Sequence, residues 1–126
     1  MLEQKAADLK IADCVTFHGN VSNVQEFMWN SDIYVHSATY EPFGLVLVEA
    51  MAAGLPVVCL DAKGNRDVVQ NQKNGFILKG EDVVEFANKV GFLYHDKFRY
   101  EQIKQEGLST AAKFDIVNYT DKLLSL

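Results

Sequence analysis

One stretch, residues 40–58, constrains the fold more than any other part of the chain, and it reads YEPFGLVLVEAMAAGLPVV. A proline and a glycine near its start mark a tight loop, and residues 45–53 are good helix formers. Gly54 then supplies a left-handed helix end, and Pro56 starts a new segment. The stretch therefore predicts a loop, a helix, a turn and a strand.

Two short apolar segments flank this loop and helix. Residues 33–35 and 56–60 are rich in β-branched side chains, which is typical of buried parallel strands. Because the helix at residues 45–53 joins them, they form a βαβ unit. In open α/β sheets the loops at the carboxyl ends of the strands form the ligand crevice. Residues 39–44 are expected to form such a loop.

The start of the predicted helix carries the groups that could bind a ligand. The N–H groups of Gly44, Leu45 and Val46 would point into the crevice from a helix N-terminus, which suits phosphate or another anion. Glu41 lies in the loop, and Glu49 shares a helix face with Leu45, four residues earlier. Carboxylates accept hydrogen bonds from sugar hydroxyls but repel phosphate. The pattern therefore suits a ligand that carries both hydroxyls and phosphates.

This stretch resembles the signature of the retaining GT-B glycosyltransferases (glycosyl transferases group 1, family four), enzymes built from two Rossmann-like domains. In that family two glutamates enclose seven residues with Phe-Gly among them, and Glu-Ala-Met-Ala-x-Gly-x-Pro-Val-Val follows, as it does here. The resemblance implies that Glu41 is the catalytic carboxylate facing the transferred sugar and that Glu49 binds the ribose hydroxyls of the donor. It also implies that the backbone of Phe43, Gly44 and Leu45 holds sugar and phosphate.

The resemblance implies two further parts of the site. It places the nucleotide base beside the backbone of Gly19, Asn20 and Val21. Many family members carry Gly-Gly-x-Pro-Glu where this chain has residues 63–67, KGNRD, which keep one glycine and an acid. This departure leaves the donor sugar open, and lone charges beside a glycine are often only solvated. The candidate phosphate or sugar contacts here are Lys63, Gly64 and Asp67.

The rest of the chain supports an α/β fold class. We expect a Rossmann-like three-layer sandwich with a small parallel sheet and a helical C-terminal tail, which is half of a GT-B fold. Ser22 or Asn23 is expected to cap the second helix, Trp29 to pack, and Asn65 to cap the fourth helix. The expected helices are residues 2–9, 21–30, 45–53, 66–70, 82–94, 97–113 and 115–126, and the expected strands are residues 14–17, 33–35, 56–60 and 76–78.

Composition narrows the function classes. A net charge of −5 argues against a nucleic-acid surface, and the longest apolar stretch is too interrupted to span a membrane. Cys14 and Cys59 both lie among apolar neighbours, which predicts buried thiols in a reducing cytoplasm. The three histidines show no ligand spacing, so we expect no metal and no cofactor. In the full-length protein the inner face of the membrane is a further candidate location.

The resemblance also implies a domain organisation. Residues 1–126 would be a single C-terminal donor-binding domain that lacks the N-terminal acceptor domain and the first strands, and would be inactive alone. The full protein would transfer a sugar from a nucleoside diphosphate sugar to a saccharide or lipid-linked acceptor, as in polysaccharide biosynthesis. Two alternatives stay open. One is a non-catalytic doubly wound binding or regulatory module, although Asp61 lacks the early acidic pair of a receiver domain. The other is a nucleotide-sugar epimerase of the same architecture.

Overall fold

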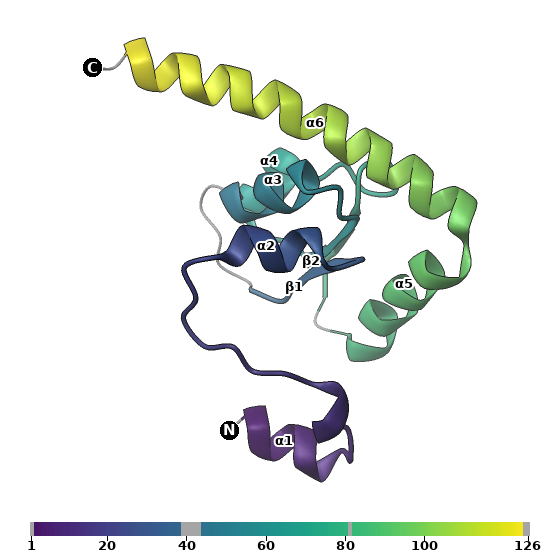
Figure 1. Ribbon diagram of the computed structural model, residues 1–126. Coiled ribbons are helices and arrows are strands. Elements are labelled where there is room, and N and C mark those ends of the chain that lie inside the picture. Colours follow the sequence, from purple (N-terminus) through teal and green to yellow (C-terminus); the bar gives the residue numbers. More distant parts are fainter. Residues whose placement is uncertain (1, 39–43, 81, 125–126) are drawn as a thin grey trace.

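The structure, a computed structural model, describes residues 2–38, 44–80 and 82–124 (Figure 1). The helices are α1 (Leu2–Asp8), the 3₁₀ turn η1 (Ala12–Cys14), α2 (Val24–Trp29), α3 (Leu45–Ala52), α4 (Lys63–Val68), α5 (Val83–His95) and α6 (Lys97–Leu124). The strands are β1 (Tyr34–His36), β2 (Val57–Leu60) and β3 (Phe76–Leu78).

The three strands form one parallel sheet in the order β1-β2-β3. β2 is the central strand, and all four of its residues are buried. Its side chains alternate between the two faces of the sheet: Val57 and Cys59 belong to the cluster around α3, whereas Val58 packs with residues of α5 and α6. Helices therefore cover both faces. The α/β fold class and the predicted βαβ unit β1-α3-β2 are confirmed.

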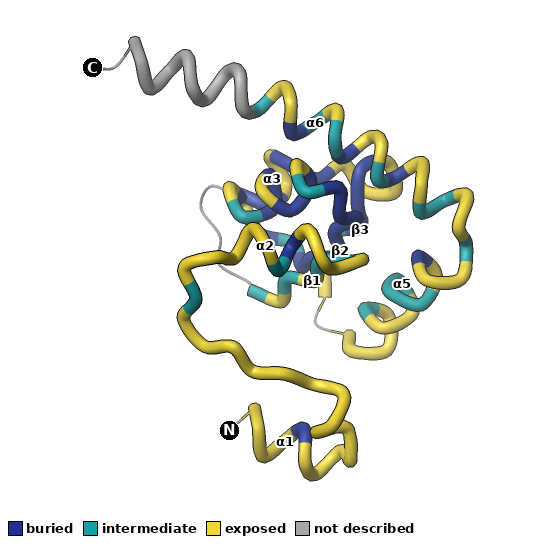
Figure 2. The backbone as a smooth tube through the Cα atoms, viewed as in Figure 1, coloured by how far each residue is buried: buried dark blue, intermediate teal, exposed yellow. Residues whose placement is uncertain are grey.

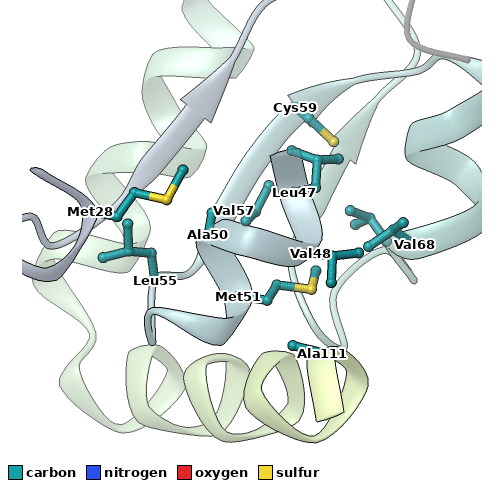
Figure 3. Close-up of a cluster of buried hydrophobic side chains, with 11 residues drawn as sticks. Met28, Leu47, Val48, Ala50, Met51, Leu55, Val57, Cys59, Val68 and Ala111 are labelled. Carbon is teal, nitrogen blue, oxygen red and sulfur yellow. The ribbon is translucent and has the colours of Figure 1, made fainter. Parts of the chain in front are cut away.

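The larger core cluster surrounds α3, which lies between the sheet and α6 (Figure 3). α3 is apolar on several sides, as expected for a helix buried between two layers. Leu47 lies near Cys59 of β2, while Met51 lies on the side of α3 nearest Ala111 of α6. At Gly107 an added Cβ would lie 3.3 Å from Cγ of Met51. The missing side chain at this glycine therefore lets α6 approach α3 closely.

Two predicted helix boundaries are wrong. α6 is continuous, and the predicted break near residue 114 is absent because neither proline nor glycine interrupts the helix there. α4 begins at Lys63, three residues earlier than expected, with Ala62 at its N-cap. Asn65 therefore lies inside the helix and does not cap it. Its side chain bonds to the Leu60 carbonyl instead, which ties α4 to the end of β2.

The predicted strand at residues 14–17 is also wrong. The chain forms η1 over Ala12–Cys14 and then runs on without strand structure, exposed along most of its length (Figure 2). A strand needs a neighbour to satisfy its backbone hydrogen bonds, and none of the described strands pairs with this segment. Cys14 is exposed as a result, so the prediction of a buried thiol is confirmed for Cys59 alone.

α2 is shorter than expected and meets the core mainly through one residue. It begins at Val24, and Asn23 occupies the N-cap position without a side-chain capping bond. Met28 is buried, but Trp29 is 61% exposed, so the expectation that it packs is wrong. Adjacent helix residues point about 100° apart, so Trp29 turns away from the face that carries Met28.

Candidate functional site

The N-terminus of α3 is built around Gly44. This glycine is buried, is the N-cap, and has φ 67°, a left-handed conformation that favours glycine. Its carbonyl accepts hydrogen bonds from the N–H groups of Leu47 (3.1 Å) and Val48 (3.3 Å). Within α3 the N–H groups of Leu45 and Val46 have no helical acceptor, and they lie at the positive end of the helix. This end of the helix is suited to an anionic group.

Gly44 meets α4 through backbone atoms. A Cβ added at Gly44 would collide with the carbonyl oxygen of Gly64, and would lie 2.9 Å from its carbonyl carbon and 3.0 Å from Cγ2 of Val68. Gly44 and Gly64 are therefore in direct backbone contact. The structure brings together two predicted site residues that lie twenty positions apart in the sequence.

Buried polar groups gather where β2 ends and α4 begins. Asn65 is fully buried, and its Nδ2 donates to the Leu60 carbonyl at 2.8 Å. In the described part of the chain, Oδ1 of Asn65 and Oδ1 of Asp61 are buried acceptors with no hydrogen-bond partner. Oδ2 of Asp61 lies 3.5 Å from Nη1 of Arg66. Sequence reasoning missed Asp61 and Asn65 as site candidates, although a polar residue directly after an apolar strand was a usable signal.

The same edge of the sheet carries a cavity of about 490 Å³ near the start of α5, lined by Ser37, Leu60, Asp82, Val83, Phe86 and Ala87. Most of these side chains are apolar, and the Asp82 carboxylate already accepts hydrogen bonds from the N–H groups of Val84 and Glu85. The phosphate-like part of a ligand therefore fits the α3 end better than this cavity.

Cys59, a buried thiol, lies on β2 close in sequence to Asp61 and Asn65. Burial, together with the nearby Asp61 carboxylate, raises the pKa of the Cys59 thiol to about 12. The thiol is therefore protonated near neutral pH, and a protonated thiol is neither a good nucleophile nor a metal ligand. Over the described ranges, no group of three or more His, Cys, Asp or Glu side chains is placed to hold a metal ion. No helix there is long and apolar enough to cross a membrane.

Comparison with known proteins identifies the family. A family model described as "Glycosyl transferases group 1" matches residues 1–110. The chain belongs to this family. Membership confirms the resemblance to the group 1 glycosyltransferases and favours a glycosyltransferase over the regulatory-module and epimerase alternatives.

This chain corresponds to only part of the length of individual group 1 family members. It is 33% identical over 125 residues to the D-inositol 3-phosphate glycosyltransferase of Stackebrandtia nassauensis, covering 98% of this chain and 28% of that protein. Anabaena Alr3699/HepE, solved in complex with UDP-glucose, is 31% identical with a TM-score of 0.87, covering 99% of this chain and 36% of that one. The chain spans less than two fifths of the length of such curated relatives.

A third comparison concerns the fold alone. The C-terminal domain of a group 1 family protein (LpcC) from Francisella tularensis is 23% identical with a TM-score of 0.77, over 89% of this chain and 59% of that chain. The fold thus matches a C-terminal domain of the GT-B glycosyltransferases, as the sequence predicted.

The remaining predicted site residues of this group 1 chain are distributed as follows. Leu45 and Glu49 are exposed on α3, and Lys63 and Asp67 are exposed on α4, next to the contact of the two glycines. Gly19 and Asn20 are exposed and Val21 is half-buried in the segment that leads into α2. Glu41 and Phe43 lie outside the described residues. Among the described candidates, Gly44 and Gly64 are the pair whose direct contact the structure shows.

Proposed function

We propose that this chain is the donor-binding domain of a retaining GT-B glycosyltransferase. The full-length protein would move a sugar from a nucleoside diphosphate sugar to a saccharide or lipid-linked acceptor. The observation that carries this proposal is the N-terminus of α3, which opens on Gly44 at the carboxyl end of β1 with the Gly64 backbone against it. Family membership supports it, and so does the UDP-glucose bound to Alr3699/HepE.

The proposal assigns separate roles to the two ends of the donor. The diphosphate would lie at the N–H groups of Leu45 and Val46, where the helix dipole stabilises the negative charge that grows on the leaving group. Glu49 would accept hydrogen bonds from the ribose hydroxyls. Glu41 would face the transferred sugar, where positive charge builds on the anomeric carbon, and the backbone of Phe43 would help to hold that sugar. No metal ion or cofactor has a part in this scheme.

Other residues would complete the donor site. The backbone of Gly19, Asn20 and Val21 would border the base, and Lys63 and Asp67, beside the glycine contact, would meet phosphate or sugar groups. We further propose that residues 1–126 act as one domain, with the acceptor bound by a second domain of a cytoplasmic protein. Because that domain would supply the acceptor site, we expect this chain to bind donor nucleotides without turning over.

The test compares UDP with uridine as ligands of this chain, using nuclear magnetic resonance titration. UDP should bind with a dissociation constant on the order of a millimolar, which corresponds to about 4 kcal/mol. The amide signals of Leu45 and Val46 should shift with UDP and stay unchanged with uridine, because uridine has no phosphate. If uridine binds as tightly as UDP, the diphosphate does not use the α3 N-terminus.

A substitution tests the ribose contact separately. Glu49→Gln removes a charge-assisted hydrogen bond and should weaken UDP binding by about 1.5–3 kcal/mol. Glu85→Gln is the matched control, because Glu85 is also exposed and lies in the first turn of α5. Equal UDP affinity in both variants would contradict the role given to Glu49.

A further inference from the structure

Asn65 and Asn74 are the buried polar side chains of the described core, and they tie α4 at different places. Asn74 bonds near the end of α4, where its Nδ2 donates to the Val68 carbonyl and to Oγ1 of Thr110, both at 3.0 Å. Asn65 bonds at the start of α4, where its Nδ2 donates to the Leu60 carbonyl at 2.8 Å. A hydrogen bond between buried groups holds its partners firmly, because breaking it leaves a polar atom without water.

The bond from Asn65 joins two features of the site. Leu60 is the last residue of β2, the fully buried central strand, so its carbonyl is a fixed point. Gly64 directly precedes Asn65, and its carbonyl lies against Gly44. The order of contacts therefore runs from the sheet through Asn65 to the Gly64 carbonyl, and from there to the N-cap of α3.

We propose, resting on the proposed function, that Asn65 is a positioning residue for the donor site. By tying the first turn of α4 to the end of β2, it sets the distance between the Gly64 and Gly44 backbones. This distance in turn fixes the direction of the N–H groups that begin α3. Asn65 acts through these backbone atoms and need not touch the donor.

The experiment compares Asn65→Ala and Asn65→Asp with Asn74→Ala in the 126-residue chain. Asn65→Asp keeps the side-chain volume and replaces only the donating nitrogen with an acceptor, so it leaves no cavity. Asn74→Ala is the matched control. Asn74 is also a buried asparagine, it makes more hydrogen bonds than Asn65, and it bonds to the other end of α4. Circular dichroism first establishes a temperature at which each variant is folded.

The first readout needs no ligand. The amides of Leu47 and Val48 donate to the Gly44 carbonyl, so their hydrogen exchange reports on the start of α3. In both Asn65 variants this exchange should rise roughly tenfold relative to the central strand β2, as loss of one buried hydrogen bond allows. Asn74→Ala should change the exchange of α3 and β2 together, because it lowers stability without moving Gly44.

The second readout is UDP affinity, which should fall by roughly tenfold in the Asn65 variants and stay unchanged in folded Asn74→Ala. Selective exchange at Leu47 and Val48 supports the positioning role even if the parent chain binds no UDP, in which case the proposed function alone fails. Equal effects of the Asn65 and Asn74 variants on exchange would overturn the positioning role. Failure of both Asn65 variants to fold would also overturn it, since Asn65 would then support the whole fold.

Discussion

At the scale of single residues, Cys59 couples the stability of the fold to pH. Its thiol is buried on β2 beside Asp61, which raises the pKa from 9.0 to about 12. Below pH 9.0 the thiol is protonated in both the folded and the unfolded chain, so the stability of the fold is not reduced by this group. Above pH 9.0 the unfolded thiol loses its proton while the folded one keeps it. The unfolded state then binds fewer protons, so the free energy of unfolding falls as pH rises.

We expect the free energy of unfolding to fall above pH 9.0 by up to about 1.4 kcal/mol per pH unit from this thiol. Urea unfolding of the parent chain and of Cys59→Ala at several pH values measures the difference in slope. Cys14→Ser is the control, because it removes the exposed thiol in place of the buried one. Parallel slopes for the parent and Cys59→Ala would rule out this coupling.

Site residues differed in how far the sequence could predict their placement. The helix start at Gly44 was predictable, because a glycine directly precedes a run of good helix formers, and Gly44 is the N-cap of α3. Its contact with Gly64 was not predictable, because a backbone contact between distant segments leaves no pattern in either one. Asn65 was predicted in the wrong role for a related reason. Its bonding partner is the Leu60 carbonyl, and any residue type at that position would supply the same group.

At the scale of elements, local sequence patterns predicted a helix or strand correctly where its packing partner lies nearby in the sequence. The β1-α3-β2 unit was predicted because apolar runs, a glycine and a proline follow one another within thirty residues. The prediction of a strand at residues 14–17 was wrong, because a strand needs a neighbouring strand to pair with. The sequence pattern of one segment cannot show whether such a neighbour is present. The expected break near residue 114 is absent from α6, because neither proline nor glycine ends the helix there.

Two helix glycines, Gly91 in α5 and Gly107 in α6, should respond differently to substitution. An added Cβ at Gly91 meets no atom within 4 Å, so Gly91→Ala should stabilise the chain by about 0.5–1 kcal/mol through helix propensity. At Gly107 the added Cβ would lie 3.3 Å from Cγ of Met51, so we expect no stabilisation there. Urea unfolding of both variants provides the comparison. A similar gain at both positions would mean that α6 can shift away from α3 at little cost.

At the scale of the whole molecule, the N-terminal segment stands apart from the body. α1 packs on η1, and the following residues run as an exposed arm toward α2 (Figures 1 and 2). The ring of His18 meets that of Phe27 with centroids 4.2 Å apart, which attaches the end of this arm to α2. The body from α2 to α6 contains both hydrophobic clusters. Its folding should therefore depend little on α1.

A compact chain of 126 residues has a radius of gyration of about 14 Å. Because of the extended arm, small-angle X-ray scattering of this chain should give a larger value. Limited proteolysis should cut first between residues 15 and 22 and leave a resistant product that begins near α2. A radius of gyration at the compact value, with no early cut in the arm, would show that the N-terminal segment folds back onto the body.

The backbone contact between Gly44 and Gly64 also bears on how such a site can change over evolutionary time. A spacing set by two main chains is not altered when an exposed side chain beside it mutates. Lys63, Arg66 and Asp67 are exposed on the same helix as Gly64, so they can be exchanged one at a time without rebuilding the scaffold beneath them. Polar groups beside the contact are thus free to diverge between lineages, whereas Gly44 is constrained, because an added Cβ there would collide with the Gly64 carbonyl oxygen.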